Sequence, residues 1–533
     1  MPQFDRRTLL NALAVSGAVT LAPHGFSRAL AQGPTPAPGA AASGQPPAAH
    51  FGFEDVVKRA RELAAAPYDA STVKLPDALT KLDFDSYREI RFKAEKSPIT
   101  AGPYRLQLFH LGYGFKRAVV INTIRDGIAT PIPYSAGLFD YGRTKFDKNL
   151  PVNLGFAGFR LHYPLSSPHS QDEIVSFLGA SYFRFLGRGQ SYGLSARGLS
   201  VNTGGDDEEF PNFREFWIET SESEPDKATI YALLDSASVT GAFRFDLYPG
   251  AESVMEVGAT LFPRRDNVKF GMAPLTSMFY ADEQHTAVKT PDEWRPELHD
   301  SDGLLMHSGA GEWIWRPLRA PRVKVMTTFA DNNIQGFGLV QRDRSFDHYQ
   351  DLELTYETRP TYFVEPHGDW GEGRIELLEL ATKDETADNI VTYWTPKTAP
   401  EANKPFTYSY SIRAVLDAAD LSPNGRVVNT WRTSPKALGS NEAVDVGSRR
   451  FIVDFAGGDL AYYAQDPNSV EISAAASVGK VTRTILMPNP HIGGFRAFVD
   501  VQVEPGQSTD IRAYLHAGPK VLTETWLMPW IAE

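Results

Sequence analysis

The sequence predicts an all-β protein with a large N-terminal and a smaller C-terminal β-sandwich. Beyond residue 80, apolar segments such as 104–112, 229–236 and 253–262 are short, and many alternate with the two-residue period of strands. The 38 prolines and 43 glycines are spread along the chain, as the turns of an all-β architecture require. No alternation of strands with helices is visible, which disfavours Rossmann and TIM-barrel folds.

The first 31 residues have the features of an export signal. Arg6 and Arg7 precede a short apolar run, and residues 29–31 supply a small-residue cleavage site. This run is too short and too weak for a membrane span, so we expect a twin-arginine signal peptide that directs export. An ordinary Sec signal that contains two arginines is the alternative. Residues 32–50 are rich in proline, glycine and alanine and are predicted to form a disordered leader.

One amphipathic helix is predicted ahead of the strands, over residues 53–68. Its apolar side chains fall on one helical face, and Pro67 helps to end it. We expect this helix to pack against the edge or the end of a sheet.

A break at residues 397–405 divides the strand-like segments into two groups. Prolines and polar residues predict an interdomain linker there. The large domain would then span residues 51–396. Residues 406–533 contain six or seven strand-like segments, enough for one small sandwich.

Composition limits the classes of partner. The chain has 0 cysteines, so neither disulfides nor thiolate zinc sites are possible. Without residues 1–31, 50 basic and 64 acidic residues remain, a net charge of −14. This charge argues against nucleic acid and anionic membranes as partners, and we expect no stable membrane insertion. A neutral sugar polymer is compatible with it.

Two short motifs favour structural interpretations over catalytic or metal-binding ones. Residues 189–193 read Gly-Gln-Ser-Tyr-Gly, but no helix pattern follows Ser191, so a glycine turn is favoured over a nucleophile elbow. His299 lies beside Asp300 and Asp302, but two aspartates are too few to complete a calcium site. We expect no metal and no cofactor.

An acidic connection between two strand-like segments is the clearest chemical feature. Residues 374–380 and 389–394 read as strands, and the connection carries Asp384, Glu385 and Asp388. Carboxylates this close repel one another, so either water solvates them or a ligand uses them. Composition alone favours a solvated acidic turn.

Longer blocks carry a family resemblance. VEPHGDWGEG at 364–373 and DETADNIV at 384–391 resemble the periplasmic glucan biosynthesis family OpgG/OpgD, also called MdoG/MdoD. Blocks at 155–161, 208–217 and 299–304 continue the match. The resemblance implies action on osmoregulated glucans with a β-1,2-linked glucose backbone, and the twin arginines indicate the D-type branch. It also implies a domain similar to galactose mutarotase followed by an immunoglobulin-like domain.

The resemblance also implies catalytic roles. Asp388 matches the general acid of similar enzymes, and Asp300 matches a general base that acts through a water relay. Tyr356 matches a tyrosine near the cleavage point. Glu385 lies in the same loop as Asp388 and could support the acid through like-charge repulsion.

A second set is expected to bind sugar, although a structural role is at least as compatible with each member. It comprises Trp370 and Trp313 as stacking platforms, and His348, Arg359, Glu365 and Asp302 as hydrogen-bonding groups.

Together these features predict an inverting glycoside hydrolase of the endo-β-1,2-glucanase type, or a transglycosylase with the same carboxylates. A non-catalytic glucan-binding scaffold is the alternative from another class, and a mutarotase-like epimerase is a generic third. A homodimer is compatible with the resemblance, with the arginine-rich segment 431–450 reaching a neighbouring groove.

Overall fold

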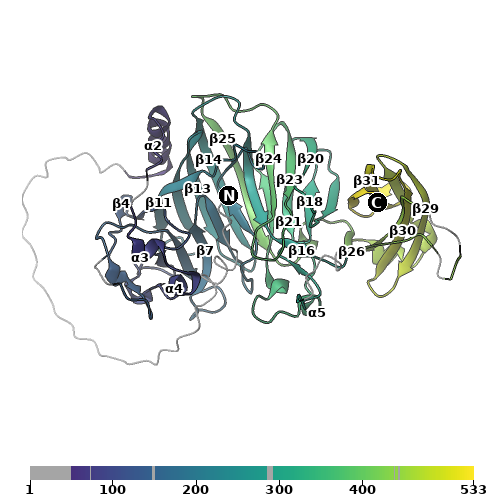
Figure 1. Ribbon diagram of the computed structural model, residues 1–533, viewed down its shortest axis with the longest axis horizontal. Coiled ribbons are helices and arrows are strands. Elements are labelled where there is room, and N and C mark those ends of the chain that lie inside the picture. The colour runs from purple at the N-terminus through teal and green to yellow at the C-terminus, as the bar shows by residue number, and fades with distance from the viewer. Residues whose placement is uncertain are drawn as a thin grey trace, which may run out of the picture.

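The computed structural model describes residues 50–71, 74–146, 150–284, 292–436, 439–441 and 445–532. The predicted signal peptide and the leader up to residue 49 lie outside these residues, as do parts of the segment 431–450. Figure 1 shows a large body of strands with a smaller β unit at the C-terminal end of the chain. The all-β prediction is confirmed. Among the described residues, no helix has the length and apolarity needed to cross a bilayer.

The first large sheet has ten strands in the order β2-β6-β7-β8-β9-β15-β24-β23-β20, and β10 also pairs with β15. Their bounds are β2 Arg105–Phe109, β6 Gly158–Tyr163, β7 Asp172–Leu178, β8 Tyr182–Phe185, β9 Ser195–Arg197, β10 Ser200–Val201, β15 Phe270–Ser277, β20 Val325–Asn332, β23 Glu372–Glu379 and β24 Ile390–Pro396.

The second large sheet has fifteen strands in the order β28-β31-β33-β19-β18-β21-β22-β25-β14-β13-β12-β11-β3-β4, and β32 also pairs with β31. Their bounds are β3 Val120–Arg125, β4 Ile128–Pro131, β11 Asn212–Thr220, β12 Ala228–Asp235, β13 Val239–Tyr248, β14 Ser253–Pro263, β18 Gly303–His307, β19 Trp313–Pro317, β21 Gly336–Val340, β22 Thr361–Pro366, β25 Phe406–Val415, β28 Glu471–Ala476, β31 Ser508–Ala517, β32 Lys520–Val521 and β33 Thr525–Ile531.

Smaller elements complete the fold. The short pairs are β1 (Arg91–Phe92) with β5 (Phe139–Asp140), and β16 (Phe279–Ala281) with β17 (Leu298–His299). A four-stranded sheet has the order β26-β27-β30-β29, with bounds Arg426–Thr433, Ser448–Ala456, Gly494–Gln502 and Lys480–Asn489. The α-helices are α2 Phe53–Ala65, α3 Asp77–Thr80, α4 Phe84–Arg88, α5 Phe346–Tyr349 and α6 Leu460–Tyr463.

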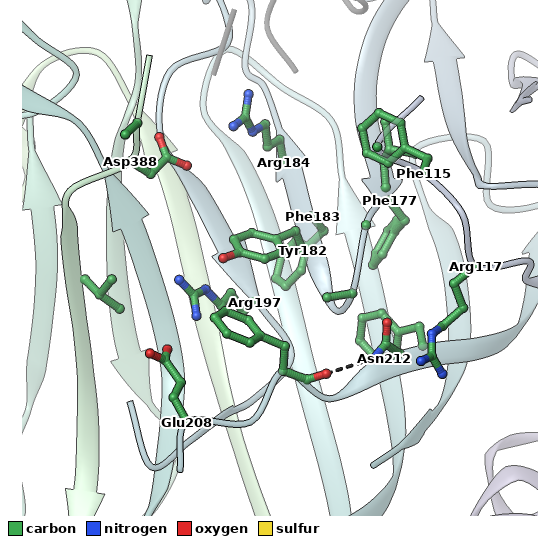
Figure 2. A pocket seen from close by; sticks show the side chains of 18 of the residues that line it. Phe115, Arg117, Phe177, Tyr182, Phe183, Arg184, Arg197, Glu208, Asn212 and Asp388 are labelled. Carbon is green, nitrogen blue, oxygen red and sulfur yellow. Dashed lines mark hydrogen bonds between the residues drawn. The ribbon is translucent and has the colours of Figure 1, made fainter. Parts of the chain in front are cut away.

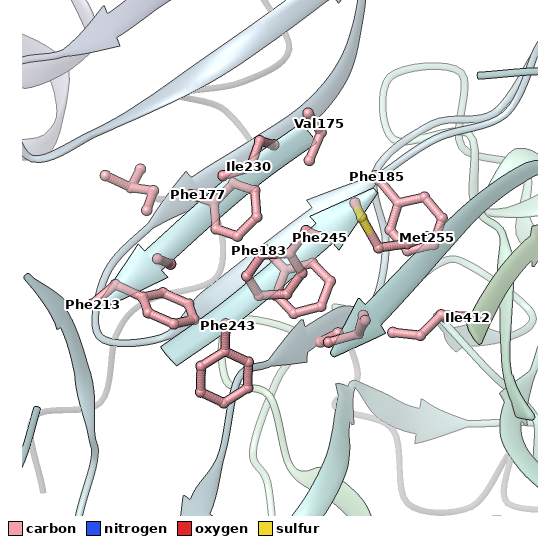
Figure 3. Packing of buried hydrophobic residues seen from close by; sticks show 14 of the residues in the cluster. Val175, Phe177, Phe183, Phe185, Phe213, Ile230, Phe243, Phe245, Met255 and Ile412 are labelled. Carbon is pink, nitrogen blue, oxygen red and sulfur yellow. The ribbon is translucent and has the colours of Figure 1, made fainter. Parts of the chain in front are cut away.

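Phenylalanines from both large sheets build the main core (Figure 3). Phe183 of β8 and Phe245 of β13 lie with ring centroids 5.1 Å apart in an edge-to-face arrangement. Phe177 of β7 contacts Phe245 at the same centroid distance. The alternation of β8 therefore turns Phe183 and Phe185 into the core. Tyr182 and Arg184, the intervening residues, are left for the opposite face of the ten-stranded sheet.

The predicted helix forms as α2, but it packs on the face of a sheet and not at an edge or end. Val56 and Ala60 are fully buried, and they lie in one cluster with Trp217 of β11 and Ala242 of β13. Thr240 of β13 donates a 2.7 Å hydrogen bond to the carbonyl of Ala60. Strands β11 to β13 present apolar side chains on this outer face, and α2 covers them.

The expected domain boundary at residue 406 is wrong. Residues 397–405 connect β24 of the ten-stranded sheet to β25 of the fifteen-stranded sheet. Strand β25 pairs with β14 on one side and with β22 on the other, so it lies inside the large sheet. The prolines there mark a crossover between two packed sheets, and a proline-rich crossover has the same composition as a linker.

The C-terminal unit packs its four-stranded sheet on β28, β31 and β33. Phe451 of β27 lies 5.6 Å from Trp526 of β33 between ring centroids. Strand β33 also pairs in parallel with β19, which joins this unit to the large sheet. Glu524, just before β33, accepts hydrogen bonds from the guanidinium of Arg342, 2.5 Å and 2.8 Å long. The two parts of the chain are therefore in direct contact.

Candidate active site

A cavity of about 590 Å³ lies against the ten-stranded sheet. Strands β7, β8 and β9 and the connection between β23 and β24 contribute to its lining. Figure 2 shows Asp388 on one side of this cavity, with Tyr182, Arg184, Arg197 and Glu208 around the same space. The predicted general acid therefore faces a space large enough for a ligand.

The predicted acidic connection closes the hairpin of β23 and β24, where Glu379 pairs with Ile390. Its three carboxylates have different surroundings. Asp384 is exposed and accepts hydrogen bonds from the backbone and hydroxyl of Thr386, at 2.8 Å and 2.5 Å. Glu385 is buried, and Asp388 is partly buried at the cavity. The solvated-turn interpretation thus fits Asp384 but not the other two.

Asn389 ties this connection to the segment that carries Asp300. Its amide accepts from the backbone N–H of Phe279 and donates to the Phe279 carbonyl, both at 2.8 Å. Phe279 pairs with His299 across β16 and β17, and Asp300 is the next residue. The backbone N–H of Asp300 donates to Met278, adjacent to Phe279, at 2.8 Å. The two predicted catalytic aspartates therefore belong to one hydrogen-bonded unit.

Glu385 is held by two donors. The hydroxyl of Tyr356 donates to its carboxylate at 2.5 Å, and Arg295 donates at 2.7 Å. Arg295 also donates to Asp351 at 3.0 Å. Burial opposes the charge of Arg295, but its bonds to Glu293 and Glu385 outweigh burial and raise its pKa. Because a guanidinium pairs with Glu385, the expected like-charge repulsion of Asp388 by Glu385 is weakened.

Asp300 forms a buried ion pair with Arg359. Both side chains are at most 1% exposed. The guanidinium of Arg359 also lies over the ring of Tyr356, 3.7 Å from its centroid. Asp300 is thus joined to Arg359 by an ion pair, and Arg359 to Tyr356 by a cation–π contact. Tyr356 is in turn joined to Glu385 by a hydrogen bond.

A second polar group lies beside Asp300. His299 is fully buried between Glu297 and Gln341, at 3.1 Å and 2.8 Å from their oxygens. Burial disfavours the imidazolium, but the hydrogen bond and charge of Glu297 outweigh burial and raise the pKa of His299 to about 9. Burial raises the pKa of Asp302 to about 6, although its carboxylate accepts the backbone N–H groups of Arg342 and Asp343.

One group of side chains near His299 has the composition of a metal site. Within the part of the chain that the structure describes, Glu297, Asp343 and His348 offer ligand atoms that all lie within 4.8 Å of one another. However, Nδ1 of His348 hydrogen-bonds the carboxylate of Asp343, and the other oxygen of Glu297 bonds His299. Hydrogen bonding accounts for this arrangement without an ion.

Ser191 does not lie in a nucleophile elbow. Strand β9 follows it, and its backbone N–H donates to the carbonyl of Thr358 at 3.1 Å. The prediction of a turn in place of a strand-to-helix elbow is confirmed.

The family scan matches nearly the whole described chain. A family model described as "Periplasmic glucan biosynthesis protein, MdoG" matches residues 51–530. The chain belongs to this family. Glucans biosynthesis protein G of Ralstonia nicotianae is 43% identical over 482 residues, covering 89% of this chain and 95% of that protein. Probable glucans biosynthesis protein D of Shewanella oneidensis is 42% identical over 478 residues, covering 88% of this chain and 87% of that protein.

In this MdoG-family protein, three expected sugar-binding residues lie away from the group around Asp300. Strand β18 begins next to Asp302, whereas Trp313 pairs with its last residue. Strand β22 begins near Arg359, whereas Glu365 lies near its end. Trp370 lies before β23, whereas the acidic connection follows that strand. These three residues are therefore at the opposite ends of the strands.

The two tryptophans differ in burial, since Trp313 is buried and Trp370 is partly buried. Trp313 is 9% exposed and stacks on His307 and Phe363, with centroid distances of 4.2 Å and 5.8 Å. The ring of Trp370 packs edge-on against Tyr408 and Tyr410. Core packing accounts for Trp313, as it does for most aromatic residues.

The other seven expected residues lie at the Asp300 end. They are Asp388, Asp300, Glu385, Tyr356, Arg359, Asp302 and His348. His348 is largely exposed and reaches this group through Asp343.

Several residues of the site were not predicted from the sequence. Arg295 and Asn389 organise it, and Arg184 and Arg197 line the cavity. Asn389 directly follows Asp388, and Arg184 alternates with phenylalanines on β8. Both residues could therefore have been found from the local sequence. Arg295 binds Glu385 across 90 residues of sequence, and no local pattern reveals such a contact.

Proposed function

We propose that this protein acts in the periplasm as a glycoside hydrolase or transglycosylase on the β-1,2-linked backbone of osmoregulated glucans. Asp388 is the general acid and Asp300 the general base. The observation that carries this proposal is the contrast between the two carboxyl groups. Asp388 lines a cavity of about 590 Å³, whereas Asp300 is fully buried against the guanidinium of Arg359. Two carboxyl groups in contrasting surroundings are what acid and base catalysis requires.

In hydrolysis, the carboxyl of Asp388 transfers its proton to the bridging oxygen while the bond from that oxygen to the anomeric carbon breaks. A water molecule attacks the anomeric carbon from the opposite face, and its proton passes to Asp300. The configuration at the anomeric carbon is inverted. In transglycosylation, a sugar hydroxyl replaces the water molecule and the proton transfers are the same.

The surroundings of Asp300 support a relay. The guanidinium of Arg359 holds the carboxyl group of Asp300 in place through a buried ion pair. Because Asp300 is fully buried, a proton reaches it through intervening groups, which agrees with the water relay that the family resemblance implies. Tyr356 and Glu385 act as positioning residues, since they connect Arg359 to the connection that carries Asp388.

The relatives' names support a role in glucan synthesis, so transglycosylation is kept beside hydrolysis. The paired arginines Arg6 and Arg7 support export by the twin-arginine route. Replacing both with lysine should leave the protein in the cytoplasm. Normal export of that variant would contradict the route but not the enzymatic proposal.

The test is incubation of the purified protein with linear β-1,2-glucan, followed by mass spectrometry of the products. Shorter linear chains indicate hydrolysis, and cyclic or branched products indicate transglycosylation. Tight binding with an unchanged chain-length distribution would instead indicate a non-catalytic scaffold. Polarimetry of glucose anomers separates an epimerase from all three.

A further inference from the structure

The cavity beside Asp388 is richer in cations than in anions. Its lining includes the cationic residues Lys116, Arg117, Arg184, Arg197 and Lys324 and the acidic residues Asp206, Glu208 and Asp388. The whole chain has the opposite balance, with 53 basic and 65 acidic residues. The charge balance of this cavity is therefore opposite to that of the chain as a whole.

Arg184 is the least exposed of these cations. It is 3% exposed, and its Nη1 has no hydrogen-bond partner among the described residues. The strand explains its direction, because Phe183 and Phe185 point into the core and Arg184 must then face the cavity side. In Figure 2 its guanidinium lies among the cavity side chains, on the same side of the view as Asp388.

Three other buried arginines of this protein are paired with carboxylates. Arg316 pairs with Glu379 at 2.7 Å, Arg359 pairs with Asp300, and Arg295 pairs with Glu385 at 2.7 Å. Burying an unpaired charge is costly, so such a group is usually compensated by a partner. Among the described residues neither Arg184 nor Arg197 has a carboxylate partner, and the cavity that both line is large enough for a ligand.

Arg197 of β9 contributes a second guanidinium to the lining of the same cavity. Arg197 is 6% exposed, and its Nε donates to the hydroxyl of Thr276 at 3.1 Å. Its guanidinium lies over the ring of Tyr182, 4.6 Å from the centroid, and these two residues are paired across β8 and β9. The planar group is thereby fixed in orientation before any ligand arrives.

We propose that this cavity is a binding subsite for an oxyanion of the phosphate-ester or carboxylate class, with Arg184 and Arg197 as its binding residues. Guanidinium groups bind the oxygens of such anions through paired, charge-assisted hydrogen bonds. The anion is either a substituent of the sugar chain or a small free ion. Placing a sugar chain here rests on the proposed function, whereas anion binding itself requires no catalysis.

Isothermal titration calorimetry at constant ionic strength tests the subsite, with inorganic phosphate, glucose 6-phosphate and glucose as probes. We expect at least one of the two anions to bind better than glucose. Arg184→Gln should weaken that binding by about ten- to a hundredfold, because a charge-assisted bond is lost. The matched control Arg188→Gln alters an exposed arginine of the same segment that does not line the cavity, and its affinity should be unchanged.

The two anions distinguish the sources. Equal binding of phosphate and glucose 6-phosphate indicates a free anion, and preference for glucose 6-phosphate indicates a sugar-borne group. The subsite is refuted if neither anion binds better than glucose, or if folded Arg184→Gln keeps the wild-type affinity. Should that variant fail to fold, Arg184→Lys keeps the charge but not the planar fork, and unchanged affinity in it refutes the assignment to the guanidinium.

The experiments distinguish a failure of the proposed glucan-cleaving activity from a failure of the proposed anion subsite. Asp388→Asn should abolish most turnover of linear β-1,2-glucan while it retains anion binding. If the wild type binds anions through Arg184 but leaves the glucan intact, the subsite stands and the proposed function falls. If the glucan is cleaved but no anion binds, the proposed function stands and the anion subsite is refuted.

Discussion

The side-chain amide of Asn389 forms two hydrogen bonds with the backbone of Phe279, one through its oxygen and one through its nitrogen, both 2.8 Å long. Asn389 follows Asp388, and Phe279 pairs with His299, which precedes Asp300. One amide side chain therefore fixes the spacing of the two aspartates, although 87 positions separate them in the sequence.

Replacing Asn389 with alanine should loosen this connection. Two buried backbone groups of Phe279 lose their partner, and we expect a stability loss of roughly 2–4 kcal/mol. Thermal unfolding measures this loss. Asn212→Ala, which removes a single bond to the carbonyl of Phe210 at the protein surface, is the control and should cost less. Equal costs in the two variants would contradict the structural role of Asn389.

Tyr356→Phe removes the hydroxyl that donates to Glu385. A hydrogen bond to a charged group contributes more than a neutral one, so we expect kcat on β-1,2-glucan to fall about ten- to a hundredfold. The fold should persist, because the ring and its contact with Arg359 remain. Tyr408→Phe changes a buried tyrosine whose hydroxyl makes only a 3.5 Å bond. A comparable loss of kcat in Tyr408→Phe would show that the effect is not specific.

Arg359→Met removes the guanidinium that forms a buried ion pair with the carboxylate of Asp300. Breaking a buried ion pair in this way costs about 3–5 kcal/mol, so we expect a large drop in the unfolding temperature. Arg359→Lys keeps the charge and should retain part of that stability. Unfolding temperatures of both variants close to the wild-type value would argue against the ion pair.

Stability should depend on pH through His299. Its folded pKa, about 9, lies above the ordinary value, so the charged form bonded to Glu297 stabilises the folded state. This contribution is complete below about pH 6.5 and is lost as the pH rises through about 9. The difference in unfolding temperature between wild type and His299→Gln should therefore shrink from pH 6 to pH 10. The exposed His169→Gln should show no such trend.

The sequence alone predicted the all-β fold class and the acidic connection that lines one side of the cavity. Period-two segments and spread turn residues predicted the strands, and the acidic connection lies between β23 and β24 as expected. Strand alternation states which face a side chain takes, but not which end of a sandwich a residue occupies. For that reason the sequence does not separate Trp313, Glu365 and Trp370, which lie at the opposite ends of the strands, from the residues around Asp300.

The pairing of strands and side chains that are far apart in the chain could not be predicted from the sequence. Strand β25 follows a proline-rich segment that resembles a linker, and only its pairing with β14 and β22 assigns it to the large sheet. The contact of Arg295 with Glu385 and the pair of Arg359 with Asp300 likewise depend on the tertiary fold. These contacts decide which acidic residue is compensated and which faces the cavity.

The rate of cleavage of linear β-1,2-glucan by Asp388→Asn, compared with Asp384→Asn, tests the central claim most directly. Both changes remove one carboxyl from the same connection, but only Asp388 lines the cavity. Loss of general acid catalysis should slow Asp388→Asn by about a hundredfold to ten-thousandfold, and Asp384→Asn should stay near the wild-type rate. An Asp388→Asn protein that cleaves the glucan at the wild-type rate would contradict the account.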